Sequence, residues 1–121
     1  MDDLTRDRIE AAVFRRLLDL LRHRTDVQNI DLMGTGGFCR NCLSDWIGEA
    51  AMDAGTPMTK GEAREYVYGM TYEAYKAAHQ TDASPEQLER MAASVRRNER
   101  LDQALAASFP ASDPPSASEP G

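Results

Sequence analysis

The chain has 121 residues, a net charge of −6 and a pI of about 4.8. A chain of this length is expected to form one domain at most. The acidic balance argues against nucleic-acid binding, and the lack of a long apolar run argues against a transmembrane helix. Residues 1–6 lack the apolar core of a signal peptide, so a bacterial-type cytoplasmic location is expected. There, cysteines are more often reduced, metal-bound or catalytic than joined in a structural disulfide.

The charge is distributed unevenly along the chain. Residues 5–24 contain six arginines and three acidic residues, a local charge of +3. Residues 25–83 contain four basic and nine acidic residues, a local charge of −5. A basic helix beside an acidic body can form pairs within one monomer or across a dimer, although two solvated faces would give the same pattern.

Residues 6–24 have the apolar spacing of an amphipathic helix with two adjacent stripes. One stripe is Ile9, Val13, Leu17 and Leu20, and the other is Phe14, Leu18 and Leu21. Together they cover about half of the helix circumference. An apolar arc of that width needs two neighbours, so we expect two helices of the same fold or a partner subunit to cover it.

A glycine-rich run follows this helix. Thr25 and Asp26 are predicted to cap a short helical turn, which Gly34, Gly36 and Gly37 are predicted to stop. The run matches neither a P-loop nor a dinucleotide-binding fingerprint. We therefore interpret the glycines as a chain reversal between two packed helices rather than as a phosphate cradle.

The next helix is predicted from about Phe38 to Ala54, with Gly55 as its stop. The helical period places one set of residues on the inward face: Cys39, Cys42, Leu43, Trp46, Ile47 and Ala50. The outward face is predicted to contain Arg40, Asn41, Ser44, Asp45 and Glu49. On this projection both thiols and the only tryptophan point into the interior.

Capping boxes mark two later helix starts. Thr59-Lys60-Gly61-Glu62 predicts a short helix, which Gly69 weakens before Thr71 begins another. Ser84-Pro85-Glu86-Gln87 predicts a further helix, with proline at the favoured first position.

After Val95 the apolar pattern changes phase, which predicts a break or hinge followed by a short amphipathic segment. In that segment Leu101, Leu105 and Phe109 have the i, i+4, i+8 spacing of a helix that docks in a partner's groove. Residues 108–121 contain four of the six prolines and are predicted to be disordered. We therefore divide the chain into a helical domain, residues 1–97, and a segment with a tail, residues 98–121.

Several runs resemble a bacterial family catalogued as domain of unknown function 1244, also called the SMc04008-like domain. The resemblance covers about residues 8–95 and is carried by 24–33, 37–43 and 65–70, with Tyr72, Lys76, His79, Gln80, Ala83 and Ser84. It implies a compact all-helical domain without an assigned activity. The ending, with its Ser-Phe-Pro-Ala-Ser-Asp-Pro-Pro sequence, resembles a tail that recurs on unrelated short bacterial proteins.

Cys39 and Cys42 allow three interpretations. As small apolar side chains they can simply fill the core. With His79 and a water or carboxylate they can bind zinc or iron, although His23 and His79 lack the spacing of a zinc-finger pair. As a dithiol, Cys39 would attack and Cys42 would resolve, and the helix N-terminus and Arg40 are expected to lower the pKa of Cys39.

We therefore expect an all-α protein, a compact bundle of four to five short helices with a disordered Pro/Ser-rich tail. The favoured function is a non-catalytic regulatory or protein-interaction module. Its partner would be an unknown protein or a second copy, bound through the first helix or through Leu101, Leu105 and Phe109. A metal-binding protein and a thiol-dependent enzyme or redox protein are the alternatives, and no nucleic-acid or membrane partner is expected.

Overall fold

The computed structural model is all-α, as predicted, and describes residues 1–108, with the side chains of residues 1–104. Six helices lie within the described residues: α1 (Asp3–His23), α2 (Asn29–Gly36), α3 (Arg40–Asp53), α4 (Lys60–Tyr68), α5 (Tyr72–His79) and α6 (Pro85–Ser108). This exceeds the expected four to five, because α2 is a separate helix rather than a single turn. Apart from Ser108, the tail predicted to be disordered lies outside the described residues.

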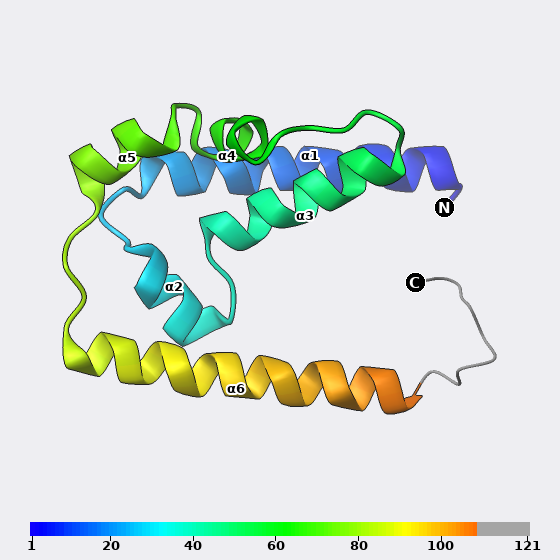
Figure 1. The fold of residues 1–121 in the computed structure, drawn as a ribbon. Helices are drawn as coiled ribbons and strands as arrows, with labels where there is room; N and C mark the ends of the chain where they lie inside the picture. Colours follow the sequence, from blue (N-terminus) through cyan, green and yellow to red (C-terminus); the bar gives the residue numbers. More distant parts are fainter. Residues whose placement is uncertain (109–121) are drawn as a thin grey trace.

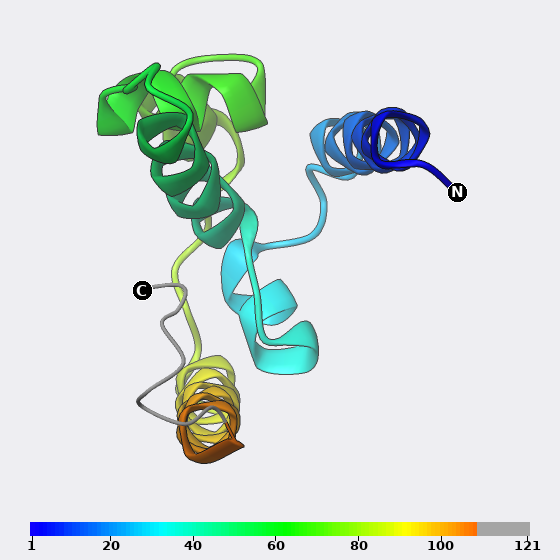
Figure 2. The same ribbon diagram turned by 90° about the vertical axis from the view of Figure 1, so that its right-hand side faces the viewer.

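The two longest helices lie at separate edges of the molecule. Figure 1 shows α1 along one edge and α6 along the other, with α2 between them, and Figure 2 shows the same separation in the perpendicular view. α4 contacts α1, α3 and α5, whereas α6 packs against α2. Over the described residues, no helix combines the length and apolar character that a membrane span requires.

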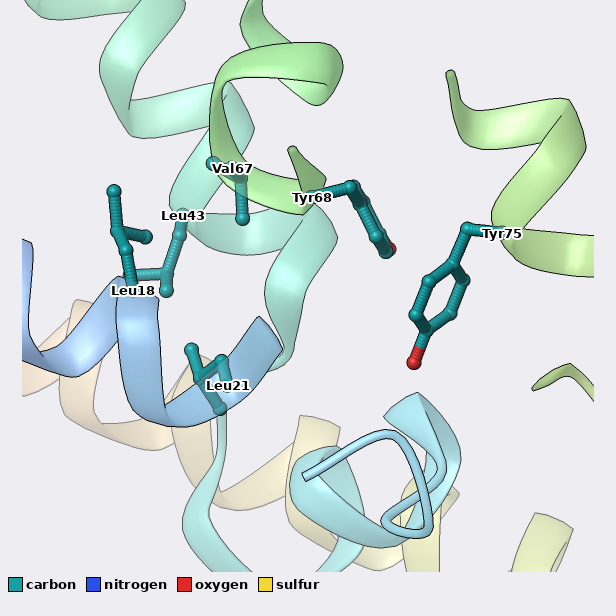
Figure 3. Packing of buried hydrophobic residues seen from close by; sticks show 6 residues of the cluster. All are labelled: Leu18, Leu21, Leu43, Val67, Tyr68 and Tyr75. Carbon is teal, nitrogen blue, oxygen red and sulfur yellow. The ribbon is translucent and has the colours of Figure 1, made fainter. Parts of the chain in front are cut away.

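The hydrophobic core lies where α1, α3, α4 and α5 meet (Figure 3). Its buried side chains are Leu18, Leu21, Leu43, Val67, Tyr68 and Tyr75. The rings of Tyr68 and Tyr75 have centroids 4.5 Å apart and are tilted by 59°, a favourable aromatic arrangement. Because this core is small, polar contacts between the helices also determine how they are positioned.

The predicted capping residues start their helices as expected. Thr59 caps α4 in a complete capping box, and Thr71 caps α5. Before α6, the Ser84 hydroxyl and the Gln87 side chain bond each other's backbone N–H groups. Gly69 ends α4 at a φ of 73°, a conformation that glycine adopts without strain. These local predictions are confirmed.

The interpretation of the glycine-rich run was wrong in two respects. α2 begins four residues after Thr25, with neither Thr25 nor Asp26 as its cap. Gly34 lies inside α2, and the helix continues until Gly37, whose φ is 78°. A Cβ at Gly34 would lie 3.4 Å from the Cβ of Arg90, so this residue lies at the contact between α2 and α6.

The predicted break after Val95 is also wrong, because α6 is continuous to Ser108. The apolar pattern of α6 changes phase where polar residues of this helix contact α2. The Ser94 hydroxyl donates to the Met33 carbonyl at 2.6 Å, and the Asn98 amide donates to the Gly37 carbonyl at 2.8 Å. The predicted division between residues 97 and 98 therefore falls inside a helix.

Candidate functional site

The first residue of α3, Arg40, is 1% exposed and is held almost entirely by backbone carbonyls. Its guanidinium donates to the carbonyls of Leu21 at 3.1 Å, Arg24 at 2.8 Å and Val27 at 2.9 Å, and to Oδ1 of Asn29 at 2.9 Å. The carbonyls at the end of α1 lack donors within the helix and lie at its negative end. These contacts, the Arg40 junction, tie the end of α1 to the start of α3.

The Arg40 junction explains why the predicted inward face of α3 is partly wrong. Arg40 and Ser44, both expected to face solvent, are each 1% exposed. Trp46, expected inside, is 53% exposed, and Ala50 is exposed too. Leu43 faces the core as predicted. A projection that assigns every arginine to solvent misses one whose charge is satisfied by carbonyls of another helix.

A chain of polar side chains continues from the junction. The Tyr68 hydroxyl accepts a hydrogen bond from Nδ2 of Asn29 at 2.9 Å and donates to Oδ1 of Asn41 at 2.7 Å. Nδ2 of Asn41 in turn donates to the Tyr72 hydroxyl at 3.3 Å. Burial raises the pKa of Tyr68 far above its usual value, and the bond from Asn29 opposes this only in part. Tyr68 therefore remains a neutral hydroxyl at physiological pH.

The two cysteines come together at the start of α3. Cys39 is the N-cap, Cys42 lies in the first turn, and their free sulfurs are 3.9 Å apart, each residue being half-buried. Burial raises the pKa of the Cys39 thiol, although the backbone amides of Cys42 and Asn41 oppose the rise. The predicted decrease in pKa is therefore wrong, because desolvation dominates and the Arg40 guanidinium is turned toward the end of α1.

Cys39 also lines a cavity of about 440 Å³ between α2, α5 and the connection from α5 to α6. Asn41, Tyr72 and Tyr75 form part of its wall, and Met91 of α6 also lines it. Cys42 is not among the lining residues. The volume falls within the range of small-molecule sites, and Cys39 is the member of the pair that lines it.

His79, the predicted third metal ligand, lies at the end of α5. Its ring packs on that of Tyr75 with centroids 5.1 Å apart, and its carbonyl accepts a hydrogen bond from Gln28. Within residues 1–104, no group of three or more His, Cys, Asp or Glu side chains is arranged to hold a metal ion. The structure thus brings Cys39 and Cys42 together but does not add His79 to them.

α1 leaves part of its apolar arc open to solvent. Ile9 is 48% exposed, Val13 64% and Leu20 54%. The helical period puts these three side chains on one side of α1, with Arg6 and Arg16 at its borders. We call this surface the α1 stripe.

α3 has an exposed face of a different character. Asp45, Glu49 and Asp53 follow one another at intervals of four residues and are all exposed. Trp46 borders this acidic row on one side and Met52, which is 69% exposed, borders it on the other. We call these five residues the α3 face.

The predicted partner-binding segment is described only in part. Leu101 is 56% exposed on α6. The side chain of Leu105 and all of Phe109 lie outside the described part of the chain. A role for these three residues in docking therefore stays a prediction.

The sequence pattern did not predict the polar residues that connect the helices, namely Arg40, Asn29, Asn41 and Tyr68. A signal was present, because Asn29 and Arg40 are the first residues of two consecutive helices, where side chains often bond unpaired backbone groups. Both also lie in the runs that carried the family resemblance.

Comparison with known families gives a match to the central part of the chain. A family model described as protein of unknown function, DUF1244, matches residues 27–93, more than half of the chain. The matched range includes the whole Cys39 cavity and both cysteines. Comparison with curated proteins finds no match. The chain belongs to the DUF1244 family of proteins of unknown function.

Proposed function

We propose that this protein is a non-catalytic interaction module that forms a dimer, in which the α1 stripe of each copy packs on the α3 face of the other. The observation that supports the proposal most directly is the exposure of Ile9, Val13 and Leu20 along one side of α1. A contiguous apolar surface with a polar border is typical of a protein–protein contact.

The adjacent apolar side of α1 is already in use. It buries Leu18 and Leu21 in the core and packs against α4. The width of the apolar arc called for a second neighbour, and the α1 stripe is the part that such a neighbour would cover. Completing the burial of its three side chains would contribute about 1 kcal/mol each, since each is about half exposed.

The charges on the two surfaces are complementary. Arg6 and Arg16 border the α1 stripe, whereas Asp45, Glu49 and Asp53 run along the α3 face. Among the described residues, neither Arg16 nor Glu49 takes part in an ion pair. Opposite charges facing each other across a contact favour the correct register and speed association.

A second copy fits this pattern because each chain has both surfaces. In a two-fold dimer, α1 of one copy meets α3 of its partner, and the same contact forms again on the other side. Such a contact closes on itself and leaves neither surface open.

Charge reversal tests the proposal. The wild type is expected to sediment as a dimer at low salt, whereas Arg16→Glu and Glu49→Arg should each dissociate at least about tenfold more readily. An equal mixture of the two variants should restore the dimer, because each mixed contact regains one acidic and one basic partner. Analytical ultracentrifugation measures all three.

The matched control is Arg8→Glu, because Arg8 is also an exposed arginine of α1 but lies away from the stripe. This variant should remain dimeric. A monomeric wild type at high protein concentration contradicts self-association. A dimer that both variants leave intact, or that their mixture does not restore, contradicts the pairing of α1 with α3.

A further inference from the structure

The cysteine pair brings two free thiols together, and one of the two residues, Cys39, lines a cavity. The sulfurs of Cys39 and Cys42 are 3.9 Å apart, and a disulfide requires about 2.05 Å. Cys39 precedes the first turn of α3 with extended backbone angles, a φ of −143° and a ψ of −178°. Side-chain rotation and a small shift of this N-cap residue are therefore enough to bring the sulfurs together, without unwinding the helix.

The cavity wall indicates which molecules can approach Cys39. Its lining residues include Tyr72, Tyr75, Met33, Met91 and Asn41, with Asp82 as the one charged residue among them. The volume of about 440 Å³ suits a small molecule. A wall of this composition favours an uncharged ligand that has both apolar and hydrogen-bonding parts.

We propose that Cys39 and Cys42 reduce small uncharged disulfides that enter this cavity. The thiolate of Cys39 attacks one sulfur of the disulfide, its S–S bond breaks, and the first product leaves as a thiolate that takes up a proton. Cys42, as thiolate, then attacks the Cys39 sulfur of the mixed disulfide and releases the second thiol. In total, one disulfide is reduced to two thiols while the protein dithiol is oxidised to the Cys39–Cys42 disulfide.

The position of the sulfurs fixes the order of these steps. Cys39 lines the cavity and Cys42 does not, so an entering disulfide meets Cys39 first. Cys42 is already within 3.9 Å and needs no rearrangement of the fold to resolve the mixed disulfide. Because burial raises the pKa of Cys39, the attacking thiolate is a minor species at neutral pH and the first step is slow.

The test uses the full chain and bis(2-hydroxyethyl) disulfide as the probe, followed by intact-mass and peptide mass spectrometry. The wild type should lose two hydrogen atoms, gain a Cys39–Cys42 link and release two equivalents of 2-mercaptoethanol. In Cys42→Ser the reaction should stop at a mixed disulfide on Cys39. In Cys39→Ser, Cys42 should react about tenfold more slowly, because it does not line the cavity.

A further variant tests whether the disulfide reaches Cys39 through the cavity. Ala83 lines the cavity and is exposed, so Ala83→Phe should narrow the entrance and slow oxidation with little change in melting temperature. Three results would overturn the proposal: sulfurs that react only after denaturation, two separate adducts without a link in the wild type, or equal rates for the two cysteine variants. An Ala83→Phe protein that folds normally and reacts at the wild-type rate would overturn entry through this cavity.

Discussion

The Arg40 junction and the exposed surfaces of α1 and α3 use charge in opposite ways. Arg40 is buried, and its four hydrogen-bond acceptors are neutral oxygens. Arg16 and Glu49 are exposed and form no ion pair among the described residues. A buried charge is costly unless its surroundings satisfy it, whereas an exposed charge contributes little to folding. The buried charge of Arg40 therefore stabilises the fold, whereas the exposed charges of Arg16 and Glu49 are available for association.

The Arg40 junction contains a further stabilising contact. The Arg40 guanidinium lies 5.5 Å from the centre of the Tyr75 ring, close enough for an attractive cation–π contact. Its Nε is buried without a hydrogen-bond partner in the described part of the chain. The junction thus depends on the outer nitrogens of the planar guanidinium, which reach several carbonyls at once.

The largest effect is expected from Arg40→Met. The substitution removes the guanidinium donor from three carbonyls and the Asn29 side chain, of which the Arg24 carbonyl and Asn29 keep a backbone N–H donor. The free energy of unfolding should therefore fall by about 3–5 kcal/mol. Urea unfolding measures the loss. Arg40→Lys should lose less, because it keeps the charge but not the planar donors. Arg8→Met, at an exposed position, should change stability by no more than about 0.5 kcal/mol, and an equal loss at both sites would contradict the comparison.

The contact between α2 and α6 is half-buried and should give an intermediate effect. Gly37 has a φ of 78°, and a Cβ there would lie 2.9 Å from Oδ1 of Asn98. Gly37→Ala should therefore destabilise the protein by about 1–2 kcal/mol through backbone strain and the displaced amide. Gly36→Ala is the matched control, because its Cβ would meet only the Phe38 ring at 3.5 Å. Thermal unfolding of the two variants should separate them, and equal melting temperatures would rule out a special role for Gly37.

The smallest effect is expected at the surface pair of Arg24 and Asp26. Two hydrogen bonds of 2.9 Å from Arg24 lower the pKa of the Asp26 carboxyl to about 2 from its usual 3.8. Because the folded-state pKa is lowered, the contribution is present above pH 3.8 and is lost as the pH falls through about 2. NMR titration of the Asp26 carboxyl checks the pKa. Asp26→Asn should change stability only slightly near neutral pH, because both side chains are exposed. A loss of stability as large as that of Arg40→Met would show that an exposed charge contributes as much to folding as the buried one.

Local sequence signals predicted the features that depend on neighbouring residues. The caps at Thr59, Thr71 and Ser84 bond backbone groups three residues away, so the sequence suffices to find them. The spacing of Cys39 and Cys42 likewise places two thiols one turn apart at a helix start. The width of the apolar arc of α1 predicted that its own fold or a partner must cover two sides.

Only the tertiary structure decided which polar groups lie inside. Arg40 bonds carbonyls 13 to 19 positions earlier in the chain, and Asn98 bonds a carbonyl 61 positions earlier. No local pattern contains those partners, which is why Arg40 was expected outside and α6 was expected to break. The same is true of the Cys39 pKa, because desolvation depends on how distant segments pack around the thiol. The sequence by itself determined where helices start and which residues lie a turn apart, whereas burial, and with it charge and reactivity, depended on the assembled fold.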